Sequence, residues 1–208
     1  MKEIFLTFTN SLTPETQSVR AILSEYATKL PDGKWRAKPE VRTGYEHQAK
    51  ENELAKLGKQ FGFDVYVADI SDETRSLVVR ELELDNIPDE QLQKIRKIDV
   101  LWLKNNQIKY CFEVENTTQI TEAISRGSNI PYKTERIIVL PDDKERLIYS
   151  KFQNIMLKER VEQDNWRVIL YSKFDDFLKE KNKTLAKFDS LAIRPRQENV
   201  KQAKITNY

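Results

Sequence analysis

The fold is decided near the middle of the chain by Ile98-Asp99-Val100-Leu101-Trp102-Leu103 and, after four polar residues, Ile108-Lys109-Tyr110-Cys111-Phe112-Glu113-Val114-Glu115. β-Branched and aromatic residues dominate both stretches, which predicts two strands. Residues 104–107 between them are typical of a hairpin turn. Because burying an unpaired carboxylate is costly, the acids within these strands, Asp99, Glu113 and Glu115, must be offset by basic side chains or by a cation.

The turn decides whether the three acids share one face of the hairpin. Side chains alternate along a strand, so Glu113 and Glu115 point to the same side. A two-residue turn at Asn105-Asn106 would pair Asp99 with Phe112, on the wrong face, whereas an odd-length loop would pair it with Glu113. We therefore predict an odd-length loop or a β-bulge that corrects the register.

Three converging carboxylates suit Mg²⁺, and also Mn²⁺, because both ions prefer hard oxygen ligands. Such a site commonly serves attack of water on a phosphodiester, since the metal polarises the phosphoryl group and activates the water. The alternative is that the acids are exposed or ion-paired on an edge hairpin. The pattern alone does not decide between these interpretations.

Strands and helices alternate around the hairpin. Thr13-Pro14-Glu15 predicts a helix that ends near Lys29, and a second helix is expected at about Tyr45 to Phe61. Further strands are expected at residues 63–68, 136–140 and 166–171, and helices at 118–128, 143–158 and shortly after Pro88. This order predicts an α/β fold in which a central mixed β-sheet is flanked by helices.

The expected domain organisation has three parts. Residues 1–44 form an N-terminal helical extension, residues 45–178 the core, and residues 179–208 a basic tail. This tail holds eight basic and three acidic side chains. Its arginines Arg194 and Arg196 are candidates for contact with nucleic acid.

Composition narrows the class of protein. The 208 residues include 33% charged side chains, and the formal net charge of +2 neither requires nor excludes a polyanionic partner. A single cysteine, Cys111, cannot form an internal disulfide and is expected in the core. No apolar stretch approaches the roughly 18 residues that a membrane span needs, so we expect a soluble, cytoplasmic protein without membrane contact.

At the central acids the sequence resembles the PD-(D/E)xK nuclease superfamily, which has the restriction-endonuclease-like fold. Asp99 resembles the first acid of its signature and Glu113 the second, while Glu115 stands where the lysine is usual. Some type II restriction enzymes also carry glutamate there. The likeness extends over about residues 45–175 to a bacterial group within the superfamily, through Glu46-His47, Ile98 to Leu103, Phe112 to Glu115, Asn116-Thr117-Thr118 and, in part, Ser125-Arg126.

The resemblance implies a role for each site residue. Asp99 and Glu113 would bind the metal together with the backbone carbonyl of Val114, and Glu115 would orient or deprotonate the attacking water. A helix carboxylate would complete the site. Glu46 is the first candidate for it and Glu51 the second.

Four further residues are candidates for contact with nucleic acid. A packed histidine is the favoured interpretation of His47, with contact to phosphate or water as the alternative. Thr117 and Thr118 are expected to cap the following helix and to lie near a bound phosphate. Arg126 either compensates the acidic charge or holds the scissile backbone.

These observations favour a Mg²⁺-dependent DNA endonuclease. By analogy with the family it would serve restriction or another defence role, and duplex cutters of this kind are often homodimers, although the sequence shows no dimer surface. One alternative is a non-catalytic nucleic-acid-binding or assembly module with the same fold, which the glutamate in the lysine position keeps open. Another is an interaction partner in which the acids are structural. The recognition sequence and the kind of nucleic acid are left open.

Overall fold

The computed structural model describes residues 21, 23–116 and 119–194, and the chain divides into two compact units, Met1–Lys50 and Glu51–Tyr208. In the first unit, β1 (Ala27–Lys29) pairs antiparallel with β2 (Trp35–Ala37). The predicted helix up to Lys29 is therefore wrong at its end, because Pro31-Asp32-Gly33 turns the chain into a hairpin, with Gly33 at a φ of 84°. The expected helical segment before residue 21 lies outside the described residues.

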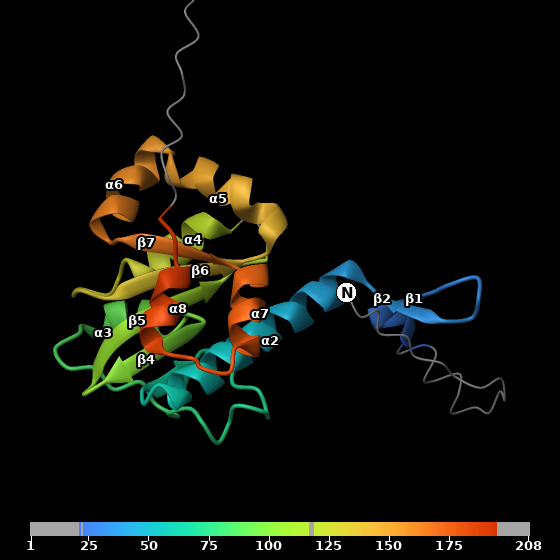
Figure 1. The fold of residues 1–208 in the computed structure, drawn as a ribbon, viewed down its shortest axis with the longest axis horizontal. Coiled ribbons are helices and arrows are strands. Elements are labelled where there is room, and N and C mark those ends of the chain that lie inside the picture. Colours follow the sequence, from blue (N-terminus) through green and yellow to red (C-terminus); the bar gives the residue numbers. More distant parts are fainter. Residues whose placement is uncertain (1–20, 22, 117–118, 195–208) are drawn as a thin grey trace, which may run out of the picture. The chain divides into compact units, whose positions relative to one another are not determined.

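The second unit is built on a five-stranded mixed sheet with helices on both faces (Figure 1). The strand order is β3 (Asp64–Val67), β4 (Val100–Lys104), β5 (Gln107–Val114), β6 (Glu135–Leu140) and β7 (Trp166–Leu170). The first three strands run antiparallel, whereas β5, β6 and β7 are parallel. The α/β fold expected from the order of elements is thus confirmed.

Each face of this sheet carries its own hydrophobic cluster. One face packs against the C-terminal part of α2 (Pro39–Gln60), against α7 (Tyr171–Lys179) and against α8 (Leu185–Leu191). The other face packs against α3 (Asp89–Ile95), α4 (Ile120–Gly127), α5 (Glu145–Phe152) and α6 (Ile155–Gln163). A short 3₁₀ helix, η1 (Asp142–Lys144), precedes α5. None of the described helices has the length and apolar character needed to span a membrane.

Two elements differ from the sequence-based expectation. The helix expected at 143–158 is broken, because Asn154 adopts an extended conformation and its side chain caps α6 by accepting a hydrogen bond from the Met156 amide at 2.9 Å. The segment expected to be a basic tail contains α8, whose Phe188 is fully buried in the core.

Close packing between α2 and β4 gives a first testable prediction. A Cβ added at Gly58 would lie 2.4 Å from Nε1 of Trp102, a fully buried ring that donates a hydrogen bond from Nε1 to the Leu54 carbonyl. We expect Gly58→Ala to lower the free energy of unfolding by about 1–3 kcal/mol, measured by urea denaturation.

The matched control is Gly44→Ala in the same helix, where the added Cβ meets nothing within 4 Å. Because alanine restricts the unfolded chain more than glycine does, this variant is expected to gain about 0.5–1 kcal/mol. A Gly58→Ala variant as stable as the parent would contradict the packing of Trp102.

Candidate functional site

A β-bulge sets the register of the central hairpin. Lys104 pairs with Gln107 across a two-residue turn in which Asn105 and Asn106 have φ values of 53° and 56°. Leu103 then pairs with Ile108, but Trp102 pairs with Tyr110, so that Lys109 is an extra residue in β5. The register after the bulge pairs Val100 with Phe112. Asp99 therefore lies opposite Glu113 and on the same face of the hairpin. Of the two predicted ways to reach this register, an odd-length loop or a β-bulge, the structure has the bulge.

Asp99 lies at the start of β4 and is fixed to the end of β5. Its Oδ2 atom accepts a hydrogen bond from the Val114 amide at 2.7 Å, and its own carbonyl accepts one from the Ala68 amide at 3.1 Å. The side chain is half-buried. The bond to Val114 holds the carboxylate, and the bond from Ala68, the residue after β3, holds the backbone of Asp99 at one end of the strands.

Glu113 is paired with an arginine from α4. It is fully buried, and its two oxygens accept hydrogen bonds from Nε of Arg126, at 2.9 Å, and from Nη2 of the same guanidinium. The parallel fork of a guanidinium matches both carboxylate oxygens at once. Of the two predicted roles for Arg126, compensation of acidic charge is the one that this geometry supports.

The electrostatics show that the acids influence one another. Burial raises the pKa of Glu113 well above its usual value, the carboxylates of Asp99 and Glu115 raise it further, and the hydrogen bonds from Arg126 oppose the shift. The same hydrogen bonds raise the pKa of Arg126. Burial also raises the pKa of Cys111, which argues against a reactive thiolate at this site.

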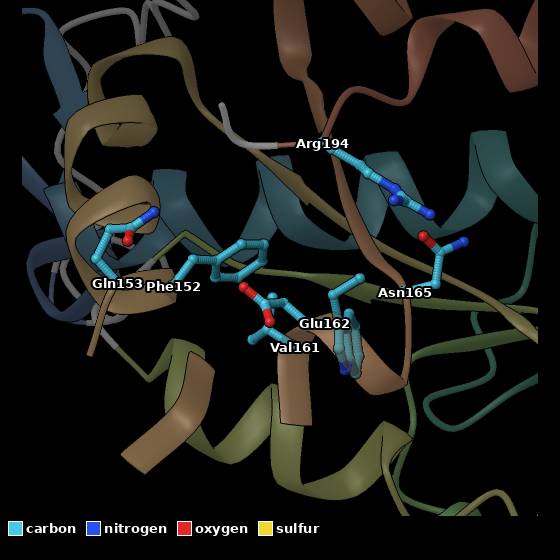
Figure 2. Close-up of a pocket in the computed structure, with 7 residues that line it drawn as sticks. Phe152, Gln153, Val161, Glu162, Asn165 and Arg194 are labelled. Atoms are coloured by element: carbon cyan, nitrogen blue, oxygen red, sulfur yellow. The ribbon is translucent and has the colours of Figure 1, made fainter. Parts of the chain in front are cut away.

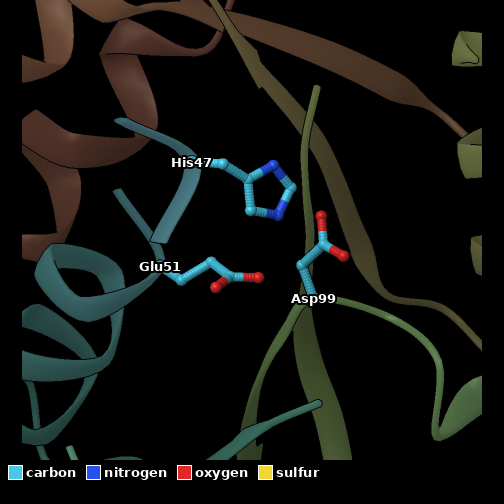
Figure 3. Close-up of side chains that lie close together, drawn as sticks. All are labelled: His47, Glu51 and Asp99. Carbon is cyan, nitrogen blue, oxygen red and sulfur yellow. The ribbon is translucent and has the colours of Figure 1, made fainter. Parts of the chain in front are cut away.

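The helix α2 brings a further carboxylate to Asp99. Glu51 is only 3% exposed, and the structure places one of its oxygens within 4.8 Å of an Asp99 oxygen (Figure 3). His47 precedes Glu51 by one helical turn, so both side chains project from the same face of α2. Glu46, the first candidate from the sequence, is exposed.

The remaining predicted site residues are placed as follows. Glu115 is 7% exposed, and its amide donates a hydrogen bond to the Val139 carbonyl at 2.9 Å, which ties it to β6. Arg194 lines a pocket described below. Thr117, Thr118 and Arg196 lie outside the described residues, and the role of the Val114 carbonyl stays a prediction.

A pocket away from the acids was not expected from the sequence. A pocket of about 120 Å³ lies beside the break between α5 and α6 and the start of β7, lined by Phe152, Gln153, Val161, Glu162, Asn165, Trp166 and Arg194. Figure 2 shows Arg194 and Asn165 on one side of it and Phe152 and Glu162 on the other. Trp166 is buried, and nothing in its sequence context indicated a pocket.

Comparison with known proteins places the chain in a family. No curated protein and no solved structure shows a significant match. A family model described as the type II restriction enzyme NmeDI C-terminal domain matches residues 29–190, well over half of the chain. The mixed five-stranded sheet flanked by helices is consistent with a restriction-endonuclease-like domain. The chain therefore belongs to the restriction-enzyme family of the type II NmeDI C-terminal domain.

Proposed function

We propose that this restriction-enzyme domain is a metal-dependent endonuclease that hydrolyses DNA phosphodiester bonds, with Mg²⁺ as its usual ion and Mn²⁺ as a substitute. The main support for the proposal is the register of β4 and β5. The bulge places Asp99 opposite Glu113, and Glu51 lies close to Asp99. The chain's membership of a restriction-enzyme family supports DNA as the substrate, and we propose a role in restriction or another form of defence.

The donor set fits a hard divalent cation. A carboxylate offers about four lone-pair sites, and Arg126 uses only two of those on Glu113, one on each oxygen. Oδ2 of Asp99 accepts a hydrogen bond from the Val114 amide. Near this pair, Asp99, Glu51 and Glu115 supply further carboxylate oxygens, the hard ligands that a doubly charged ion prefers.

We assign the residues as follows. Asp99, Glu113 and the Val114 carbonyl would hold the ion, with Glu51 rather than Glu46 as the helix carboxylate. An ion bound there supplies Lewis-acid polarisation of the phosphoryl group and a bound water of lowered pKa. Glu115 accepts the proton of the attacking water, and Arg126 keeps Glu113 oriented.

Glu51→Gln separates the two candidate helix carboxylates. The variant loses a buried negative charge near Asp99, so we expect its Mn²⁺ affinity to fall about 10- to 100-fold, measured by electron paramagnetic resonance. Glu46→Gln changes an exposed glutamate five residues earlier in the same helix and should bind Mn²⁺ as the parent does. Loss of affinity in Glu46→Gln alone would reverse the assignment.

The activity itself is tested on supercoiled plasmid DNA. The intact chain is incubated with Mg²⁺, Mn²⁺, Ca²⁺ or a chelator, and conversion to nicked and linear forms is followed on gels. We expect cleavage with Mg²⁺ and Mn²⁺ and none with the chelator. Linear product without prior nicking would support two copies acting on the two strands, as in the homodimer expected above. Binding without cleavage under every condition would instead favour the non-catalytic nucleic-acid-binding module.

A further inference from the structure

The break between α5 and α6 exposes two large apolar side chains. Ile155 is 92% exposed and Met156 is 89% exposed, the highest values among the large hydrophobic residues that the structure describes. The cap formed by Asn154 fixes the backbone that presents them. The inward stripe of α6 consists of Leu157 and Val161, so Ile155 lies about 200° away from Leu157, at about 100° per residue. These two side chains form what we call the apolar tip.

The apolar tip is surrounded by positive charge. Residues 144–160 hold five lysines and arginines and two glutamates, five minus two giving a net charge of +3. Lys158 follows Ile155 by three residues and Arg160 follows Met156 by four, so each lies beside a tip residue on α6. Neither cation forms an ion pair within the described part of the chain. A polyanion is therefore the partner with complementary charge.

The pocket of Figure 2 is lined in part by the residues that lead into the apolar tip. Phe152 and Gln153, which line it, immediately precede Asn154. Two of its buried polar atoms, Oδ1 of Asn165 and Nε1 of Trp166, have no hydrogen-bond partner among the described residues. An unsatisfied buried polar group costs about 1–3 kcal/mol, so a polar ligand that enters the pocket and displaces its wall enough to reach these atoms gains them as partners.

We propose that the tip and the pocket together take one nucleobase out of a DNA duplex. Ile155 and Met156 enter the base stack, as apolar wedges of DNA-binding proteins do. The displaced base enters the pocket, against the rings of Phe152 and Trp166. The Glu162 carboxylate accepts a hydrogen bond from an exocyclic amino group of the base, and Arg194 donates a hydrogen bond to a ring nitrogen. Cytosine and adenine carry both groups.

This inference rests on the proposed function, because its partner is DNA. The sheet places the pocket and the acidic site within reach of one duplex. Cys111 pairs with Arg136 and Arg136 with Trp166, so Trp166 lies on the same face as Glu113. Strand spacing puts the two about 10 Å apart across the sheet and about 7 Å along it. A protein partner fits the tip less well, because a stable interface needs about 800 Å² on each side.

The test uses short duplexes of random sequence in which 2-aminopurine replaces some adenines, with Ca²⁺ to prevent cleavage. Intact protein should increase the fluorescence, because an unstacked 2-aminopurine is brighter. The double variant Ile155→Ser/Met156→Ser should bind about tenfold more weakly and lose the increase. Asn165→Gly removes the pocket amide, tolerates the φ of 55° at this position, and should also lose the increase. Ile70→Ser, another exposed isoleucine, is the matched control and should keep it.

The outcomes separate this inference from the proposed function. Cleavage with Mg²⁺ but an equal fluorescence increase in parent, tip and pocket variants, or none in any of them, overturns base displacement and leaves the nuclease intact. A fluorescence increase that depends on the tip and pocket, without cleavage, supports base displacement and overturns the nuclease. If the tip variant instead loses binding to anionic phospholipid vesicles while DNA binding is unchanged, the tip is a membrane contact and the inference is wrong.

Discussion

Asp99→Asn is expected to abolish metal-dependent DNA cleavage, with a rate loss of about a thousandfold or more. A Lewis-acid metal supplies several kcal/mol of transition-state stabilisation, and each 1.36 kcal/mol is about tenfold in rate. Asparagine has nearly the same shape as aspartate, and its amide oxygen can still accept the hydrogen bond from the Val114 amide. The loss would therefore report the missing charge rather than a displaced strand.

The measurement is the initial rate of plasmid nicking at saturating Mg²⁺. The variant must unfold at the parent's urea concentration and bind duplex DNA with the parent's affinity in Ca²⁺. Asp64→Asn, which changes an exposed aspartate on the neighbouring strand β3, is the matched control and should cleave normally. Cleavage by Asp99→Asn at the parent's rate would remove Asp99 from the mechanism.

The second large effect concerns stability. Arg126→Met leaves Glu113 buried without its guanidinium partner, and breaking a buried ion pair from one side costs about 3–5 kcal/mol. The converse variant Glu113→Gln should cost less, because Arg126 is 28% exposed and can turn towards solvent. The double variant Arg126→Met/Glu113→Gln should be more stable than Arg126→Met, since no charge remains buried. The free energies of unfolding of the parent, the two single variants and the double variant, measured by urea denaturation, complete a double-mutant cycle.

The stability loss of Arg126→Met should depend on pH. Without Arg126, burial and the carboxylates of Asp99 and Glu115 all raise the pKa of Glu113 in the folded chain. Below the unfolded-state pKa of glutamate, about 4.3, the carboxyl is protonated in both states and the loss is small. The loss grows as the pH rises through the folded-state pKa of Glu113 in the parent towards the higher folded-state pKa that Glu113 has without Arg126. A loss that is constant over this range would show that Glu113 is not the buried charge responsible.

Much of the central hairpin could be predicted because side chains alternate between the two faces of a strand, which leaves few possible registers. Placing Asp99 on the face of Glu113 required either an odd loop or a bulge, and the structure has the bulge at Lys109. The N-terminal hairpin was missed, because a Pro-Asp-Gly segment ends a helix and also turns a hairpin equally well. The break at Asn154 was missed because its cap competes with a continuous helical pattern on either side.

The site was harder to predict because its partners come from distant parts of the chain. Glu46 and Glu51 were both candidates for the helix carboxylate, and only the burial of Glu51 beside Asp99 distinguishes them. The pairing of Arg126 with Glu113 depends on how α4 packs against β5. The pocket at Trp166 is lined by residues from α5, α6, β7 and the segment after α8, so no local sequence pattern could predict it.

The central claim, that aligned acids on β4 and β5 hold a catalytic ion, is tested most directly by titrating Mn²⁺ into the chain and recording bound ion by electron paramagnetic resonance. The account predicts saturable binding by the parent, loss of that binding in Asp99→Asn, and normal binding in Asp64→Asn. Saturable binding that is equally strong in parent and Asp99→Asn, or no saturable binding by the parent at all, would contradict it.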